Sequence, residues 1–396
     1  RIVVPHAGAR AWLEATLAGR LEASSPGRGD GIIANVDFLF PGSIPLLAQE
    51  PVGGPDPWSV DRLTFAVLAG LAGDAAAALP IDRANHPLLE ARRLAIRFDE
   101  YHVRRPTMIR QWDRSPPNPV LSPTASDEVH DGEPVPDKLP AADRWQFELW
   151  QALRRAIGQP PPPSRLTAAH QADRGPLLVA GVESLSFFQL ECLLTLGERC
   201  DVEVLLVHPS PGLERRLEPT LPAPTPGTTR RRGEPELLDG VDPLVGTWLA
   251  GVHNQQILLA SQGVAVTSGA RDPGLLPTTL LGRMQATVAT ASLPRPATHA
   301  LATDPSFTIH RCHNLARQAE VIHEALLHCF ADLPDLEPHE VAIVSPCIEQ
   351  AAPHLSAAFS REIVGRPAAA VSLPLRIADR GIREVSPGAE LLAALL

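Results

Sequence analysis

The residue type that would hold a nucleoside triphosphate is almost absent from this sequence. Lys138 is the only lysine among 35 lysines and arginines. A P-loop needs a lysine that follows a glycine and precedes Ser or Thr, because its ammonium group and nearby backbone N–H groups hold the phosphates. Lys138 stands between prolines, in GEPVPDKLP, and leucine follows it. The sequence therefore predicts no ATPase site, and outside this loop it has no lysine for a Schiff base.

Other catalytic constellations are also missing. The sequence has no G-x-S-x-G elbow, and none of its five cysteines has protease-like neighbours. We find no paired carboxylates of the nuclease type. Asp37 follows an apolar run, as the magnesium-binding acid of an ATPase would, but without a P-loop lysine we interpret it as a capping or turn residue. We therefore predict that this chain has no catalytic residues of its own.

A metal site is the next chemistry to consider. His310 and Cys312 would share one face of a strand, and His313 would stand at its end, so three ligands could converge. No fourth ligand follows at a recognisable spacing, and strand alternation favours a core position for Cys312. We predict no metal. Three charged or polar residues on the following helix would share about one face and are interpreted as a structural network: Arg317, Glu320 and His323.

A run of arginines is the best candidate surface for nucleic acid. Residues 92–114 contain seven arginines against three acidic residues, within a chain of net charge −10. That overall charge counts against a generic nucleic-acid binder, although a basic path can cross an acidic protein. The predicted helix at 88–105 has an apolar stripe of Leu94, Phe98 and Tyr101, and beside it a basic stripe of Arg93, Arg97 and Arg104.

Two aromatic rings in this region could receive an unstacked base. They belong to Tyr101, the only tyrosine, and Trp112. We therefore list both with the arginines as candidates for contact with DNA. The alternative interpretation is an ordinary solvated helix face with Arg–Glu pairs along it, in which case Tyr101 and Trp112 are core residues.

The elements that would position these residues follow an α/β pattern. Short runs of Val, Ile and Leu at 2–4, 33–38, 177–182, 202–207, 307–312 and 341–345 indicate strands of a parallel sheet. Helical periodicity follows four of them, at 9–21, 186–196, 315–329 and 349–359. The stretch from 60 to 157 is mostly helical. We therefore predict a sheet domain with a helical insertion at 60–157.

Composition divides the chain further. Residues 115–140 and 209–235 are rich in Pro, Ser, Thr, Asp and Gly, so they are predicted to be disordered loops. An aperiodic stretch at 290–305 suggests one domain at 1–300 and the start of a second at 301–396. No apolar run is long enough to span a bilayer, and five cysteines without a C-x-x-C pair favour the cytoplasm. Because the sequence does not begin with Met and ends in AELLAALL, we expect a fragment.

Several blocks resemble a known family. GIIANVDFLFPGSI, SFTIHRCHNLARQAEVIHEALL, EVAIVSPCIEQAAPHLSAAF, FDEYHVRRP and LPLRIADR are similar to the amino-terminal part of the RecC family, the gamma chain of exonuclease V. The resemblance implies an inactive superfamily 1 helicase-like (RecA-like) domain with an all-helical insertion, followed by a second α/β domain.

The same resemblance implies a role. It is that of a noncatalytic DNA-binding and scaffolding subunit in a heterotrimer with RecB-like and RecD-like partners, which bind ATP and Mg and process double-strand ends for recombinational repair. In the best-studied members a patch in this region recognises a single-stranded Chi sequence, so the resemblance also implies that this chain scans single-stranded DNA for a Chi-like sequence. The matching positions here are Phe40, Asp99, Glu100, Arg105 and Arg165. Three further positions are Pro5, Ala7 and Ala11, whose side chains cannot hydrogen-bond a base, so reading of the same octamer is not expected.

Three alternatives remain open at this point. The B-type subunit of a related helicase–nuclease has a similar inactive core, although GIIANVDF and LPLRIADR favour the gamma chain. A Rossmann-type nucleotide-sugar enzyme would need a glycine-rich turn or an acidic pair after a strand, and neither stands out. A pure interaction scaffold would make no contact with DNA.

Overall fold

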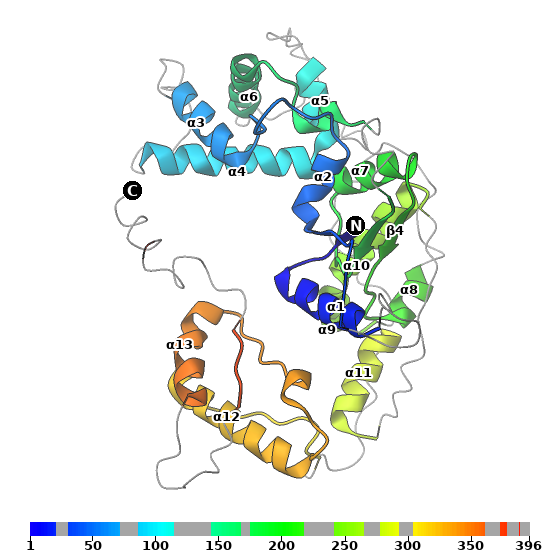
Figure 1. Ribbon diagram of the computed structural model, residues 1–396, viewed down its shortest axis with the longest axis vertical. Helices are drawn as coiled ribbons and strands as arrows, with labels where there is room; N and C mark the ends of the chain where they lie inside the picture. Colours follow the sequence, from blue (N-terminus) through cyan, green and yellow to red (C-terminus); the bar gives the residue numbers. More distant parts are fainter. Residues whose placement is uncertain are drawn as a thin grey trace. The chain divides into compact units, whose positions relative to one another are not determined.

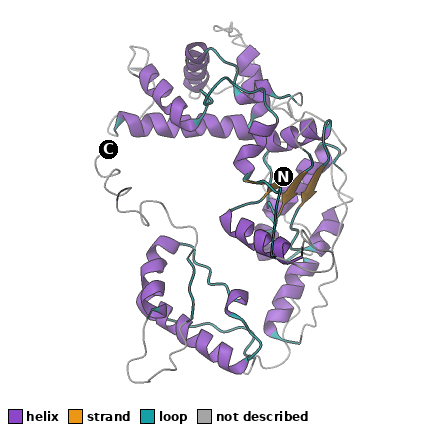
Figure 2. Cartoon of the chain, in the orientation of Figure 1, coloured by secondary structure: helices purple, strands orange, loops and turns teal. Residues whose placement is uncertain are grey.

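The computed structural model describes residues 1–20, 31–71, 86–114, 144–167, 175–217, 241–264, 278–292, 304–360, 373–377 and 388. Within the chain, two compact units separate, Arg1–His299 and Ala300–Leu396. The division lies beside the domain boundary expected from composition. Helices predominate in the described residues and a single sheet lies in the first unit (Figure 2). No helix among these residues is long and apolar enough to cross a bilayer.

A four-stranded parallel sheet forms the centre of the first unit (Figure 1). Its order is β2-β1-β3-β4, and every neighbouring pair is parallel. The strands are β1 (Ile2–Val3), β2 (Phe38–Leu39), β3 (Leu177–Ala180) and β4 (Val202–Leu205). The α/β prediction is thereby confirmed at this level. The strand expected at 33–38 is wrong except for its last residue, because Asn35 has a φ of 56° and so interrupts the extended backbone.

Two helices contribute to the core of the sheet, α2 (Ile44–Leu47) and α7 (Phe187–Gly197), and the 3-10 helix η1 (Pro41–Ser43) precedes α2. Helix α1 (Ala7–Arg20) follows β1 and has no buried residue. Val3, Leu177 and Val179 pack with apolar residues of α2 and α7 in one buried cluster. Ser186 starts α7 with a capping box, in which its side chain and that of Gln189 satisfy backbone N–H groups.

In the sequence, a group of four helices follows β2 and precedes β3, and we call this group the helical cluster. It consists of α3 (Val60–Leu71), α4 (Pro87–Arg104), α5 (Pro106–Arg114) and α6 (Arg144–Ile157). The cluster begins and ends at the residues predicted from helical periodicity. Its core is separate from that of the sheet and contains Trp58, Phe98, Trp112 and Trp150. The indole of Trp112 lies edge-on to that of Trp150, with ring centroids 5.7 Å apart.

The chain leaves and re-enters the sheet region at one place. Gln49 and Leu166 form an isolated antiparallel bridge. On either side of it, the Glu50 N–H donates to the Arg165 carbonyl over 2.9 Å, and the Thr167 N–H donates to the Ala48 carbonyl over 2.8 Å. Arg165 belongs to the 3-10 helix η4 (Pro162–Arg165). This paired segment is the base of the helical cluster.

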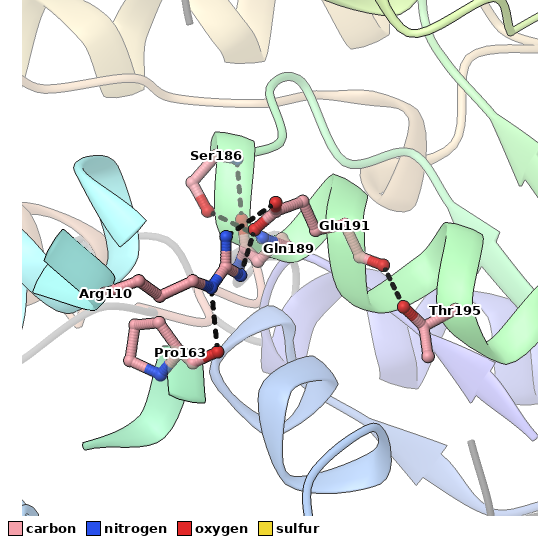
Figure 3. Close-up of polar contacts among 6 residues, drawn as sticks. All are labelled: Arg110, Pro163, Ser186, Gln189, Glu191 and Thr195. Atoms are coloured by element: carbon pink, nitrogen blue, oxygen red, sulfur yellow. Dashed lines mark hydrogen bonds and ion pairs between the residues drawn. The ribbon is translucent and has the colours of Figure 1, made fainter. Parts of the chain in front are cut away.

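A bidentate ion pair joins the helical cluster to the sheet region (Figure 3). Arg110 of α5 donates from its two terminal nitrogens to the Glu191 carboxylate of α7, over 3.0 and 2.8 Å. Its Nε donates to the Pro163 carbonyl of η4 over 3.0 Å. One guanidinium therefore holds α5, α7 and η4 together. Because both charged groups are largely buried, salt screens the attraction between them less than it would at the surface.

A second set of helices follows β4. It contains α8 (Pro211–Leu217), α9 (Pro243–Trp248), α10 (Ala250–Ser261) and α11 (Leu280–Thr290). Residues 209–235 were expected to be a disordered loop, and that is wrong for 211–217. The Ser210 hydroxyl accepts from the Leu213 N–H over 3.2 Å, and Leu213 packs in a small apolar core. Residues 218–235 and 115–140 lie outside the described residues.

The second unit contains helices α12 (Leu315–Asp332) and α13 (Ile348–Phe359) and the 3-10 helix η7 (Pro338–Glu340). Both α-helices were predicted, and Asn314 caps α12 by accepting from the Arg317 N–H over 2.8 Å. The strands expected at 307–312 and 341–345 are not formed among the described residues. Alternation is nevertheless present, because Val341 and Ile343 are half-buried whereas Val344 is exposed.

The Arg110–Glu191 pair should contribute measurably to stability. In a double-mutant cycle with Arg110→Ala and Glu191→Ala, we expect a coupling energy of about 1–3 kcal/mol, because the two groups form one hydrogen-bonded unit. The exposed Arg317–Glu320 pair is the control, with about 0.3–0.5 kcal/mol expected. Denaturant unfolding of the four variants of each pair gives both values. Equal coupling in the two pairs would contradict a structural role for Arg110.

Candidate nucleic-acid interface

Helix α4 has one buried and one exposed face. Its buried face consists of residues spaced by four, three and four positions, which are Ala91, Ala95, Phe98 and His102. Leu94 and Tyr101, expected at the centre of the apolar stripe, are only partly buried and pack at its margin. The predicted basic stripe is exposed, as the helical period requires. Helix α4 therefore presents arginines outward from a well-packed core.

Most of these arginines already have an acidic neighbour. Arg93 pairs with Glu90 over 3.0 Å, and Arg97 lies 4.0 Å from Glu100. Arg92 reaches across to Asp61 of α3 over 3.2 Å. These are the pairs of an ordinary solvated helix face, the alternative considered for this sequence. Their positive charge is thus partly neutralised.

Three arginines of the segment have no acidic partner in the part of the chain that the structure describes. Arg104 and Arg105 lie side by side at the carboxyl end of α4, and Arg114 ends α5; all three are exposed. Two of them, Arg104 and Arg105, stand at the corner between α4 and α5, whereas Arg114 is at the far end of α5. We call Arg104 and Arg105 the α4–α5 corner. A cation at a helix carboxyl end also interacts favourably with the helix dipole.

The aromatic candidates have a different place from the one expected. Trp112 is 1% exposed and packs edge-on against Tyr101, Phe147 and Trp150. Its ring therefore cannot stack on a base, and that prediction is wrong. Tyr101 is partly buried, and its hydroxyl donates to Gln146 Oε1 over 2.6 Å. The period of α4 indicated burial for Phe98, and on α5 the spacing of Met108, Ile109 and Trp112 is that of one apolar helix face, a signal that could have placed Trp112 in the core.

Two of the positions carried over from the resemblance lie in one polar group. Arg165 is buried and its guanidinium forms an ion pair with Asp56. Asp99 is close enough to Asp56 for that carboxylate to raise its pKa, after the larger effects of burial and of Glu100. His102 lies beneath this group, where burial and then Arg165 lower its pKa to about 3. Arg165 therefore makes its contacts within the protein, at the base of the helical cluster.

The remaining carried-over positions lie elsewhere. Phe40 is exposed and precedes η1, after β2. No described contact joins it to Arg165 or Asp99. Pro5 and Ala7 stand where β1 gives way to α1, and Ala11 is on that helix. The structure thus brings Asp99 and Arg165 together but gives no contact that joins them to Phe40 or to the α4–α5 corner.

Arg110 was not singled out from the sequence, although it holds the helical cluster in place. It counted only as one of seven arginines, and its partner Glu191 is 81 residues away. No local spacing could have identified that pair. Arg154 of α6 and Asp113 of α5 form a similar pair over 2.6 Å. Both interactions remove arginines from the set available to a ligand.

The predicted structural network of the second unit is only partly formed. Arg317 and Glu320 pair over 3.0 Å on the exposed face of α12. His323 does not join them. Its ring lies edge-on to Phe359 of α13, with centroids 4.9 Å apart, so it helps pack the two helices.

Trp112→Ala should destabilise the first unit without changing contact with DNA. We expect a loss of about 3–5 kcal/mol, since a large buried side chain is removed from a packed core. The control is Trp12→Ala, because Trp12 is 67% exposed and its loss should cost less than about 0.5 kcal/mol. Thermal unfolding and affinity for single-stranded DNA are measured on both. Normal stability with weakened DNA affinity in Trp112→Ala would contradict the core assignment.

Comparisons with known proteins identify the family. Residues 1–287 match the family model described as RecC, N-terminal domain. The whole chain is 31% identical over 428 residues to the RecBCD enzyme subunit RecC of Mycobacterium tuberculosis, 28% identical to that of Mycolicibacterium smegmatis, and 23% identical over 471 residues to that of Escherichia coli. It spans 36–38% of the length of these relatives. Because that family model matches more than half of the chain, this chain belongs to the RecC family.

Proposed function

We propose that this chain is the noncatalytic DNA-binding and scaffolding part of a RecBCD-type helicase and exodeoxyribonuclease. Such a complex would process double-strand DNA ends for recombinational repair. The relatives carry the name RecBCD enzyme subunit RecC, and the chain covers only the part of them given above. RecB-like and RecD-like subunits are accordingly the proposed partners, with ATP and Mg bound in those subunits and the assembly in the cytoplasm.

The observation that carries the noncatalytic role is the single lysine. Phosphoryl transfer by a helicase-type ATPase depends on a lysine that neutralises the β- and γ-phosphates. Lys138 is the only candidate, and its proline-flanked surroundings do not fit a phosphate-binding turn. The first unit thus has a parallel sheet, as nucleotide-binding domains do, but lacks the lysine ammonium group that would neutralise the phosphates.

The arrangement of the first unit is compatible with a helicase-like frame. In the sequence, the helical cluster lies between β2 and β3. The chain enters and leaves the cluster at one paired segment, Ala48–Glu50 against Arg165–Thr167. It has its own core. We propose that it is an insertion into a RecA-like domain and that residues 301–396 begin a second domain of this type.

We propose that single-stranded DNA contacts the α4–α5 corner. Arg104 and Arg105 are exposed and adjacent, and they have no acidic partner among the described residues. Such cations attract phosphates and release counterions on binding. Arg93 and Arg97 are less suitable, since Glu90 and Glu100 accompany them. Because Trp112 is buried, the proposed contact depends on charge more than on stacking.

Reading of a Chi-like octamer is not included in this proposal. Arg165 is engaged with Asp56, and Pro5, Ala7 and Ala11 offer no side-chain donor or acceptor. Base readout requires such groups at base edges. The proposal is therefore threading of DNA irrespective of sequence, with Phe40, Asp99 and Glu100 as further residues near which the strand would pass.

The salt dependence of binding tests this proposal. Replacing Arg104 and Arg105 with Ala in the full chain should flatten the slope of log K against log salt by about 1.4, since each phosphate contact to a single strand contributes roughly 0.7. Fluorescence anisotropy with a labelled single-stranded oligonucleotide at several salt concentrations gives the slope.

The matched control is the double replacement of Arg93 and Arg97, which removes two arginines from the same helix. We expect a smaller change in slope for this variant. Melting temperatures exclude a loss of fold as the cause. If the two double variants have the wild-type slope, or if only the Arg93 and Arg97 variant changes it, the corner does not bind the phosphates.

A further inference from the structure

One face of the sheet is open over β3 and β4, the strand at its edge (Figure 1). The register of these parallel strands places Leu178 beside Glu203 and, two residues on, Ala180 beside Leu205. Side chains alternate along a strand, so these residues share one face, and the residues between them pack with α2 and α7 on the other. Leu205 is 50% exposed, and Val207, which continues the alternation, is 62% exposed. We call the surface of Leu178, Ala180, Leu205 and Val207 the open sheet face.

Helix α1 meets the same face of the sheet but at its opposite edge. Arg10 Cζ lies 5.6 Å from the centroid of the Phe38 ring, and Phe38 and Leu178 are both in register with Ile2. In the order β2-β1-β3-β4, β4 is about 14 Å from β2 at the usual strand spacing, whereas a helix is about 10 Å wide. Parallel sheets are normally covered on both faces. The open sheet face therefore has room for a further helix.

Acidic side chains border the open sheet face at the amino end of β4. Asp201 and Glu203 alternate onto the same face as Leu205, and both are exposed. Neither forms an ion pair within the part of the chain that the structure describes. Of the basic residues at this end, Arg199 is exposed in the turn before β4, and the Arg1 side chain donates to a backbone carbonyl of the loop before β3. The surface is thus apolar toward the carboxyl end of β4 and acidic toward its amino end.

We propose that the open sheet face binds an amphipathic helix of a partner subunit, with basic residues along one edge of that helix. Its apolar stripe would lie on Leu178, Ala180 and Leu205, as α7 lies on the other face of the sheet. A lysine or arginine beside the stripe would meet Glu203, whose charge has no basic partner among the described residues. This inference rests on the scaffolding part of the proposed function and is independent of the DNA contact.

Two other occupants fit the open sheet face less well. A second copy of this chain that docked by the same face would bring Asp201 and Glu203 of both copies together, and like charges at an interface are unfavourable. Nucleic acid would bring phosphates toward the same two carboxylates, which repel them, and would leave Leu205 and Val207 in water. The charge and the apolar area together favour a basic-edged protein helix.

Two synthetic peptides test the proposal on the full chain. Both are amphipathic helices of about 20 residues with the same leucine stripe, one with Lys and one with Glu at the flanking positions. Fluorescence anisotropy measures the binding of each labelled peptide. We expect saturable binding of the Lys peptide and about tenfold or weaker binding of the Glu peptide, because the border of the surface is acidic.

Substitutions locate the binding. Leu205→Ser should weaken the Lys peptide about tenfold, since an apolar anchor is lost, whereas Leu194→Ser should leave its affinity unchanged, because Leu194 is an exposed leucine on the outer side of α7. Glu203→Lys should also weaken the Lys peptide, and Glu349→Lys, which changes an exposed acid of the second unit, should not. Melting temperatures establish that each variant is folded. If Leu205→Ser is unfolded, Val207→Ser replaces it, since that residue follows β4.

The outcomes separate this inference from its alternatives. Absence of Lys-peptide binding, equal binding of both peptides, or equal effects of Leu205→Ser and Leu194→Ser would overturn the docking surface. Self-association in sedimentation that Leu205→Ser abolishes would assign the face to a second copy. If a form of the chain as long as its relatives binds neither peptide while the 396-residue chain binds the Lys peptide, the face is covered by its own polypeptide and the partner assignment is wrong.

The DNA proposal can fail independently of this one. Replacement of Arg104 and Arg105 should weaken binding of single-stranded DNA and leave peptide binding intact. Leu205→Ser should do the reverse. Displacement of the Lys peptide by a single-stranded oligonucleotide would show that the two ligands share a surface, and it would contradict the open sheet face as a separate docking site.

Discussion

One guanidinium joins the helical cluster to the sheet region. Arg110 donates to both oxygens of Glu191 on α7 and to the Pro163 carbonyl at the base of the cluster. A planar fork that meets a carboxylate in this way fixes orientation as well as distance. The α4–α5 corner is a few residues away in the chain and takes its orientation from this junction. A lysine could not make these three bonds with the same geometry.

The core of the helical cluster decides what its surface can do. Trp58, Trp112 and Trp150 pack together, and His102 lies edge-on to Trp58 with centroids 5.2 Å apart. Burial lowers the pKa of the His102 imidazole, and the ring is therefore uncharged. With the large aromatic rings turned inward, arginines and a few exposed apolar side chains remain outside. The exposed arginines of the α4–α5 corner then suit phosphate, as proposed above.

Sequence reasoning succeeded where the signal was local. Helix α7 was predictable because Ser186 precedes an apolar run and Gln189 completes its cap, and the helical cluster was predictable from the period between 60 and 157. It failed where a single backbone angle or a distant partner decided the outcome. Asn35 shortens β2, and Arg110 meets a residue far along the chain. The inward direction of Trp112 was missed although Met108, Ile109 and Trp112 lie on one apolar face of α5.

The central proposal is that this chain of the RecC family, whose first unit contains a four-stranded parallel sheet, holds no nucleotide. Equilibrium binding of a fluorescent ATP analogue to the full chain, with and without magnesium, tests it most directly. Because no lysine is available to neutralise the β- and γ-phosphates, we predict no saturable binding under either condition. Magnesium-dependent binding with a dissociation constant of about 1 μM, equivalent to roughly 8 kcal/mol, would contradict the account.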